Sequence, residues 1–575
     1  MLANYTFRIV NGLIPMRLPF FYICWKFFRL FQGWKVASFV LGLVFSQSLS
    51  HIVAISNLMP YLINVLEEKL PLAAATANLR TGITAIMAIF GAHLSDAYTG
   101  FYRLIFYSTI IYITGLLLLT ISAFKLHPEA TSAYGSSDRL WVFRMALLLV
   151  ALGKAGHTPM LKAFGACQLK SRGAEDDESD DKVHARLNCW WCIGVNAGAF
   201  CGILLLAIVE GRQYWVAGYG VLTLTMCIAF CIFVLGKPLY KCVEPRGSLL
   251  SRASRVLVAA FFKRHLDVPT DASQLYHGDS NQLLHTDSLR CLDKAAIVES
   301  QSSELNEDRT KRRLCTVMEV EETKLLLRMF PIWTTFLNYG LVKSLGSTFF
   351  LQQGSNMDRK YSLGNVPLPF LLIFTRYVSG QIIWLNKRLS KAYPELEQVM
   401  TPLVRIGIGL IFGILCCSIA SSVEAKRFDI VKRHDLQDRP KETLPINVFW
   451  LTPQFMLLGA MDGFTYPGIK DFYYNQVPKS MWSFGPSFTL SVIGFGSLLS
   501  VIDIAATDKA SKQGGRTSWF ADSINKSRLD IFYLSLVILS CINLVFYGFL
   551  ARKYTYKKAV SEDDPDSGVI DTMSF

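Results

Sequence analysis

Long uninterrupted apolar runs constrain this chain more than any other feature of its sequence. Runs of about 20 residues, such as Leu104–Phe124 and Ile531–Leu550, are long enough for a helix to cross a bilayer. They recur along all 575 residues, of which 51% are hydrophobic and 18% charged, whereas soluble domains carry about 25% charged residues. We therefore expect an all-α polytopic membrane protein.

Hydropathy predicts twelve membrane spans in two groups of six. The spans cover residues 36–64, 78–98, 102–124, 139–166, 189–209, 213–236, 324–351, 365–386, 401–423, 446–470, 480–506 and 528–551. Two six-helix halves of this kind usually enclose a transport site near the bilayer midplane. The predicted domains are a leader (1–35), an N-terminal half (36–236), a linker (237–322), a C-terminal half (323–551) and a tail (552–575). We expect the linker to be partly disordered, because residues 265–307 are rich in Ser, Asp, Gln and His.

The basic residues predict that both ends of the chain lie in the cytosol. The leader carries five basic residues and no acid, and the tail begins with Arg552 and Lys553. The aromatic segment 17–29 of the leader has the composition of an interfacial helix. The net charge of +14 then reflects membrane topology, so we expect the lipid bilayer and not nucleic acid as a partner. A cytosolic linker would also be open to phosphorylation by kinases, and both the plasma membrane and the vacuolar membrane fit this topology.

Several motifs follow one another along the chain in the order of one family. The turn Gly91-Ala-His-Leu-Ser-Asp96-Ala-Tyr-Thr-Gly100-Phe-Tyr-Arg103 fits the loop signature of the major facilitator superfamily. Further matches are Gly153-Lys-Ala-Gly-His-Thr-Pro159, Trp191-Cys-Ile-Gly-Val-Asn196-Ala-Gly198, Leu327-x-x-x-Pro331-Ile-Trp333, Ser347-Thr-Phe-Phe-x-x-Gln-Gly354, Trp450-Leu-x-Pro-Gln454 and Ser523-Ile-Asn-Lys-Ser-Arg-Leu-Asp-x-Phe-Tyr533. From about Gln32 onward the chain resembles the plant nitrate and peptide transporter family, the proton-dependent oligopeptide branch of that superfamily. The resemblance implies the twelve-helix major facilitator fold and secondary transport.

The same resemblance assigns a gating role to Asp96 and Arg103. A carboxylate at a tight turn can sit at a helix N-terminus and hold two helices in one of two arrangements, while Gly100 permits the reversal of the chain. A plain solvated turn is the alternative. Relatives usually carry Arg where this chain has Phe101, which weakens the charge of the gate.

The departures from the family concern proton coupling. Relatives typically carry a Glu-x-x-Glu-Arg cluster in the first span and a Lys in the fourth. Aligned with that pattern, this chain has Val44, Gln47 and Ser48 in the first span and Thr158 in the fourth. None of these side chains can carry the coupling proton, so we expect weak or absent proton coupling. The acid of the tenth span survives as Asp462.

Charged residues at mid-span point to the substrate. Each costs about 2.5–3.5 kcal/mol on insertion scales and so needs a reason. At this depth the spans contain one acid, Asp462, and three cations, which are Lys154, Lys343 and Arg376. This excess of positive charge favours an anionic substrate. The alternatives are that Lys154 snorkels or pairs helices, that Lys343 forms an ion pair with Asp462, and that Arg376 faces a neighbouring helix.

Other polar residues in the spans are candidates for contacts with the substrate. His51 and His157 titrate near neutral pH and could relay a proton, or they could be ordinary core histidines. Orienting contacts could come from Asn57, Tyr61, Asn338 and Tyr339, for each of which a helix-pairing hydrogen bond is the alternative.

The leading functional hypothesis is alternating-access transport of a small nitrate-like anion, a small organic solute or a peptide, with weak or absent proton coupling. The first alternative is a proton-coupled nitrate or oligopeptide symporter that uses Asp462 or a histidine. The second is a non-transporting sensor or scaffold. An enzyme is not expected, because the chain has no nucleophile elbow, no phosphate-binding Gly-rich loop and no metal-ligand cluster in its sequence pattern, and we expect neither a cofactor nor a metal.

Overall fold

The computed structural model describes residues 35–124, 136–173, 180–212, 214–240, 247–269, 274–276, 285–298, 314–361, 364–440, 442–513 and 518–554. The predicted interfacial helix of the leader and almost all of the tail lie outside these residues. Within them the chain is predominantly helical, as the apolar runs predict.

Six spans form the N-terminal half. The first consists of α3 (Lys35–Ser50), the π-helical turn η1 (His51–Ser56) and α4 (Leu58–Asn64). The others are α5 (Leu70–Leu94), α6 (Phe101–Phe124), α7 (Ser136–Gly173), α8 (Asp180–Arg212) and α9 (Trp215–Leu235), with a second π turn, η2 (Ser95–Thr99), between α5 and α6. π turns inside helices are frequent at functional sites, so η1 marks the first span as a place to look for one.

Six further spans form the C-terminal half. The first of them consists of α12 (Val317–Ser347) and α13 (Phe349–Ser355). The others are α14 (Pro369–Ala392), α16 (Pro402–Arg433), α17 (Thr452–Gln476), α18 (Gly485–Ser511) and α19 (Leu529–Lys553), with the short helix α15 (Pro394–Val399) after α14. The prediction of twelve spans in two halves is confirmed.

Nine stretches of the described residues are long and apolar enough to cross a membrane by length and composition. One of them, Leu70–Phe124, contains both α5 and α6, while α14 and α17 do not qualify. These two helices carry the charged candidate residues Arg376 and Asp462, respectively.

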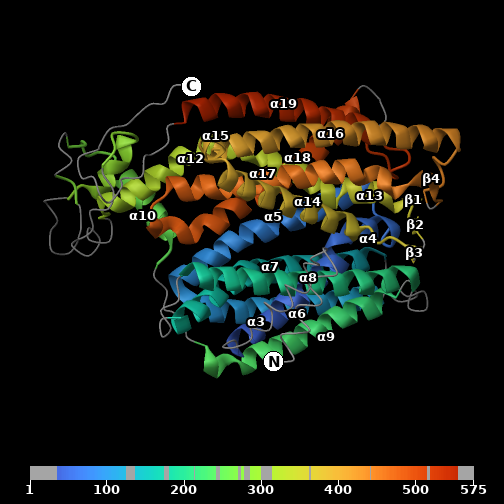
Figure 1. Cartoon of the computed structure of the whole chain (residues 1–575), viewed down its shortest axis with the longest axis horizontal. Coiled ribbons are helices and arrows are strands. Elements are labelled where there is room, and N and C mark those ends of the chain that lie inside the picture. Colours follow the sequence, from blue (N-terminus) through green and yellow to red (C-terminus); the bar gives the residue numbers. More distant parts are fainter. Residues whose placement is uncertain are drawn as a thin grey trace, which may run out of the picture.

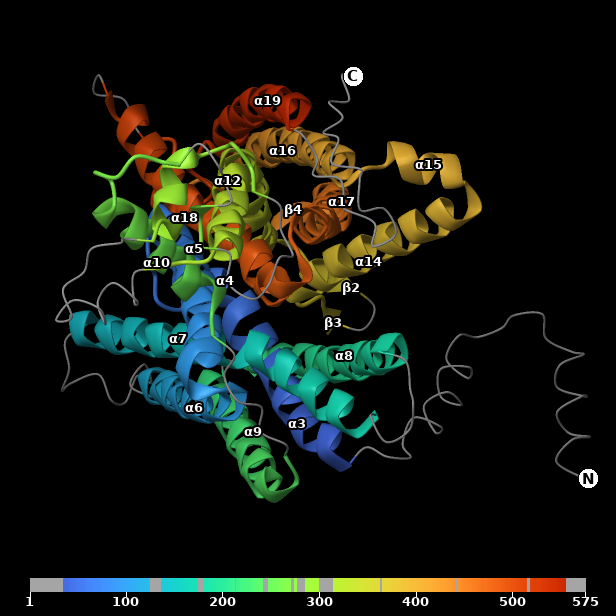
Figure 2. The same ribbon diagram turned by 90° about the vertical axis from the view of Figure 1, so that its left-hand side faces the viewer.

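The two halves lie one above the other, with their helices running in the same general direction across the view of Figure 1 and tilted relative to one another in Figure 2. Helices α5 and α18 pack against one another across the boundary, where Asn78 Nδ2 donates a hydrogen bond to Ser500 Oγ at 3.0 Å. Close approach requires Gly82 at this contact, because a Cβ there would meet Leu498 at 2.5 Å. The view along the helices in Figure 2 shows the two halves from the end at which α10 lies.

We name the two ends of the bundle by what they carry. The linker end carries α10 (Leu249–Phe262), and the distal end carries two small sheets (Figure 1). In these sheets β1 (Met357–Asp358) runs parallel to β4 (Leu444–Asn447), and β2 (Lys360–Tyr361) runs antiparallel to β3 (Gly364–Asn365).

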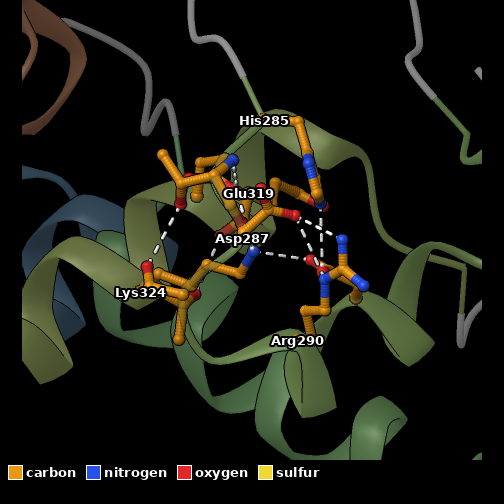
Figure 3. Close-up of polar contacts among 10 residues, drawn as sticks. His285, Asp287, Arg290, Glu319 and Lys324 are labelled. Carbon is orange, nitrogen blue, oxygen red and sulfur yellow. Dashed lines mark hydrogen bonds and ion pairs between the residues drawn. The ribbon is translucent and has the colours of Figure 1, made fainter. Parts of the chain in front are cut away.

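Part of the linker, which was expected to be partly disordered, is folded. Helix α10 and the 3₁₀ turn η6 (Arg290–Ala296) bury an apolar cluster against the start of α12. Buried Lys324 binds Asp293 at 2.7 Å and Glu321 at 2.8 Å, and His285 reaches the same Asp293 at 3.0 Å (Figure 3). This paired charge network holds the linker residues in place without a large hydrophobic core.

Candidate functional site

A carboxylate with three partners forms the C-terminal part of the site. Asp462 on α17 accepts hydrogen bonds from Lys343 and from the Tyr339 hydroxyl, both on α12, and from Ser379 Oγ on α14 at 3.2 Å. Lys343 Nζ also donates to the Tyr339 hydroxyl at 2.9 Å and lies 5.8 Å from the ring centre of Tyr466. The ion pair between Lys343 and Asp462, considered above as an alternative to substrate contact, is therefore formed.

The N-terminal part of the site contains an amine that forms no ion pair among the described residues, and a neutral hydrogen bond. Lys154 Nζ on α7 lies 3.3 Å from His51 Nδ1, at the start of η1. One turn further along α7, Thr158 Oγ1 accepts a hydrogen bond from Gln47 Nε2 of α3. Uncharged side chains thus meet at two of the aligned coupling positions.

The other two positions of the lost cluster are also uncharged and occupied by local contacts. Ser48 Oγ donates to the backbone oxygen of Val195 at 2.6 Å, and Val44 is buried in the core. A proton taken up in this region would therefore need a group other than these four.

Two guanidinium groups complete the charge distribution, and sequence reasoning missed one of them. Arg376 on α14 and Arg80 on α5 both lie within electrostatic range of Lys154 and His51. The predicted second span began at residue 78, which put Arg80 near its edge. Helix α5 begins at Leu70, so Arg80 lies about 15 Å along it. A longer window over the apolar and Ala-rich residues before 78 would have placed it within the span.

Positive charge dominates this region. Within the described part of the chain no carboxylate forms an ion pair with Arg80, Lys154 or Arg376, and Asp462 is already paired with Lys343. The Nε atom of Arg80 is buried and has no hydrogen-bond partner among the described residues. Such an arrangement attracts anions with oxygen acceptors.

The halves are joined by ion pairs at the distal end. Glu210 at the end of α8 binds Arg359, which follows β1, at 3.6 Å and accepts a hydrogen bond from Asn57 Nδ2 at 3.1 Å. A second pair joins Lys69 to Asp522 at 3.0 Å, and α4 packs against α13. We call these contacts the distal closure, and the group of Arg80, Lys154 and Arg376 the charged cluster. Asn57 thus belongs to the distal closure.

At the linker end two lysines of opposite halves lie within electrostatic range of one another. Lys162 on α7 and Lys470 on α17 are both exposed, and neither forms an ion pair among the described residues. Each lies about 12 Å along its helix from a site residue, Lys154 and Asp462 respectively. Two like charges disfavour close approach of these helices here, whereas ion pairs of opposite charge join the two halves at the distal end.

Three predicted residues lie apart from the charged cluster. Tyr61 packs edge-on to Trp215, with ring centres 4.8 Å apart, in the core of the N-terminal half. Asn338 bonds Ser540 of α19 at 3.1 Å, which is the helix-pairing alternative. His157 is buried in the core beside Tyr112, and its Nε2 has no hydrogen-bond partner among the described residues.

The predicted gate lies at the turn between α5 and α6. Gly100 adopts φ +73° there, a conformation that favours glycine. The backbone oxygen of Asp96 accepts a hydrogen bond from Gly247 N at 3.0 Å, and His93 Nδ1 lies 2.8 Å from Ser248 Oγ. Arg103 is exposed and forms no ion pair among the described residues. The turn therefore contacts the linker through its backbone.

The linker network could in principle bind a metal. His285, Asp293 and Glu321 offer ligand atoms within 4.8 Å of one another. However, the Lys324 ammonium already lies between the two carboxylates and also donates to Thr286 O at 2.8 Å. The protein supplies its own cation at this position, so a divalent ion would have to displace a buried lysine.

Comparisons with known proteins agree with the architecture. A family model described as PTR2, POT family, matches residues 102–520. Protein NRT1/ PTR FAMILY 5.6 of Arabidopsis thaliana is 35% identical over 542 residues, covering 91% of this chain and 92% of that protein. Protein NRT1/ PTR FAMILY 5.7 of Arabidopsis thaliana is 34% identical, with 91% and 89% covered. The solved structure of an auto-inhibited POT family peptide transporter superposes with a TM-score of 0.63 at 16% identity, covering 92% of this chain and 98% of that one.

Proposed function

The chain belongs to the POT family of membrane transporters, and on that premise we propose that it moves a small anion across the membrane without proton coupling through the family's first-span carboxylates. It is an integral, multi-pass secondary transporter and not an enzyme. The proposal concerns its substrate and its coupling.

One observation supports an anionic substrate. Arg80 and Lys154 of the N-terminal half and Arg376 of the C-terminal half approach one another without a paired carboxylate among the described residues. Uncompensated cations inside a membrane protein are costly, and a bound anion offsets that cost. The nitrate-like anion expected from the sequence fits this charge, and so does a small organic anion.

The uncharged contact between Gln47 and Thr158 supports the absence of coupling. Neither side chain changes charge with pH, so a pH gradient has nothing to act on at these positions. The membrane potential supplies about 2.3 kcal/mol per charge per 100 mV, which is enough to drive an anion towards the positive side.

The test uses the purified full-length protein in liposomes, with nitrate uptake followed at set pH gradients and set voltages. We expect uptake to follow voltage and to change little with the pH gradient. The combined variant Val44→Glu, Gln47→Glu, Ser48→Arg and Thr158→Lys should gain dependence on the pH gradient. Robust proton-driven currents in the unmodified protein would refute the proposal.

The same measurements address the alternatives. A pH optimum that disappears in Asp462→Asn would indicate proton symport through that residue, and binding without flux would indicate a sensor. We also propose that the linker end and both chain ends face the cytosol, in the plasma membrane or the vacuolar membrane. Phosphorylation of the linker by kinases remains a prediction.

A further inference from the structure

The permanent positive charges of the site are divided between the two halves. Arg80 extends from α5 in the N-terminal half and Arg376 from α14 in the C-terminal half, and a guanidinium group stays protonated in proteins. Both lie within electrostatic range of Lys154 and His51. Packing of α14 against η1 and of α5 against α7 brings these groups together.

Resting on the proposed function, we propose that the transported anion carries two negative charges, and that Arg80 and Arg376 select it. One acidic group of the substrate lies against Arg80 and Lys154, and the other lies against Arg376. The class comprises small dicarboxylates and doubly charged oxyanions such as sulfate, which present the same oxygen acceptors to a guanidinium group.

Alternating access makes the number of negative charges on the substrate important. The halves must approach and separate around the site during transport, so Arg376 moves relative to the N-terminal cations. The site carries three positive charges, Arg80 and Lys154 in one half and Arg376 in the other, so a single negative charge offsets only one of them. Two negative charges, one facing each half, offset Arg376 and part of the N-terminal charge, which lowers the repulsion that opposes closing of the loaded site.

Hydrogen bonding points to the same ligand. The buried Nε of Arg80 has no hydrogen-bond partner among the described residues, whereas Nη2 of the same guanidinium group donates to Thr81 Oγ1 at 3.0 Å. An unmet buried donor is expensive, and a ligand oxygen would satisfy it. Asp462 cannot do so for the whole cluster, because Lys343, Tyr339 and Ser379 already bind it.

The test compares anions of one and two charges on the full-length protein in liposomes. The probes are nitrate and acetate with one charge, and sulfate and succinate with two, each measured as kcat/KM for uptake at fixed voltage. We expect at least one of the two doubly charged probes to be transported at least tenfold better than either singly charged probe. Preference for sulfate alone identifies an oxyanion, and preference for succinate alone identifies a dicarboxylate.

The variant Arg376→Gln should reduce this preference at least tenfold while changing nitrate uptake far less. Arg388→Gln is the matched control, because Arg388 lies on the same helix about 18 Å further along it, with its guanidinium 5.1 Å from the Trp384 ring centre. If Arg376→Gln does not fold, as judged by size-exclusion chromatography, Arg80→Gln supplies the same comparison.

The outcomes separate the two proposals. Transport of nitrate or acetate with no preference for sulfate or succinate overturns the inference and leaves anion transport standing. An unchanged preference in both arginine variants also overturns it. Uptake of none of the four anions, together with proton-driven uptake of a neutral dipeptide, overturns the proposed function itself.

Discussion

The ion pair at the distal closure offers the sharpest test of the arrangement. In Glu210→Gln the amide keeps an oxygen that can accept the hydrogen bond from Asn57, so the change removes the charge opposite Arg359 and little else. We expect the distal end to open more often, because this pair joins α8 of one half to the segment after β1 of the other.

The magnitude follows from the geometry. At 3.6 Å the Coulomb energy is about 5 kcal/mol for an effective dielectric constant of about 20. Both side chains are about one fifth exposed, at 23% and 22%, and solvent screening lowers measured pair energies well below that figure. We therefore expect about 1–2 kcal/mol, which shifts the ratio of closed to open distal ends about 5- to 30-fold.

Hydrogen–deuterium exchange of the protein in lipid nanodiscs measures this shift at α4 and α13. The matched control is Lys69→Gln, since the Lys69–Asp522 pair joins the same end but its side chains are 70% and 77% exposed. Pairs this exposed contribute little, so the control should exchange as the unmodified protein does. Equal effects of the two variants, or unchanged exchange in Glu210→Gln, would refute the assignment of the distal closure.

Three further predictions concern single contacts. Asp462→Asn leaves Lys343 without its carboxylate and should lower the free energy of unfolding by about 1–3 kcal/mol, measured by thermal unfolding. The double variant with Lys343→Met should recover part of the loss, and no recovery would contradict the pairing. Burial raises the pKa of the Cys315 thiol, so this thiol stays protonated below that raised pKa. Iodoacetamide should therefore alkylate exposed Cys291 much faster than Cys315, as measured by peptide mass spectrometry. Equal rates would contradict the folded linker. Gly100→Ala should cost about 1–3 kcal/mol because of the φ of +73°, and an unchanged unfolding temperature would contradict that backbone conformation.

The packing of the helices gives some residues a role that differs from the one predicted from sequence. Tyr61 and Asn338 were polar candidates in sequence, and each turned out to serve the packing of its own half, because an apolar span does not reveal which of its faces meets another helix. Arg80 escaped notice for a different reason, since its place in the membrane depended on where α5 begins. Helix ends are the weakest part of any hydropathy profile, because the last turns are semi-polar.

The sequence by itself determined the twelve spans and the two halves, and its alignment with the family pattern predicts that the coupling carboxylates are lost. These properties follow from the length of apolar runs and from the identity of residues at given positions, which need no knowledge of neighbours. The tertiary structure alone decided that Lys343 is paired with Asp462 and that Arg80 joins Arg376 near Lys154. Charges interact through space, so Lys343 and Asp462 become neighbours only when α12 packs against α17. Arg376 meets Arg80 and Lys154 only after the two halves have packed against one another.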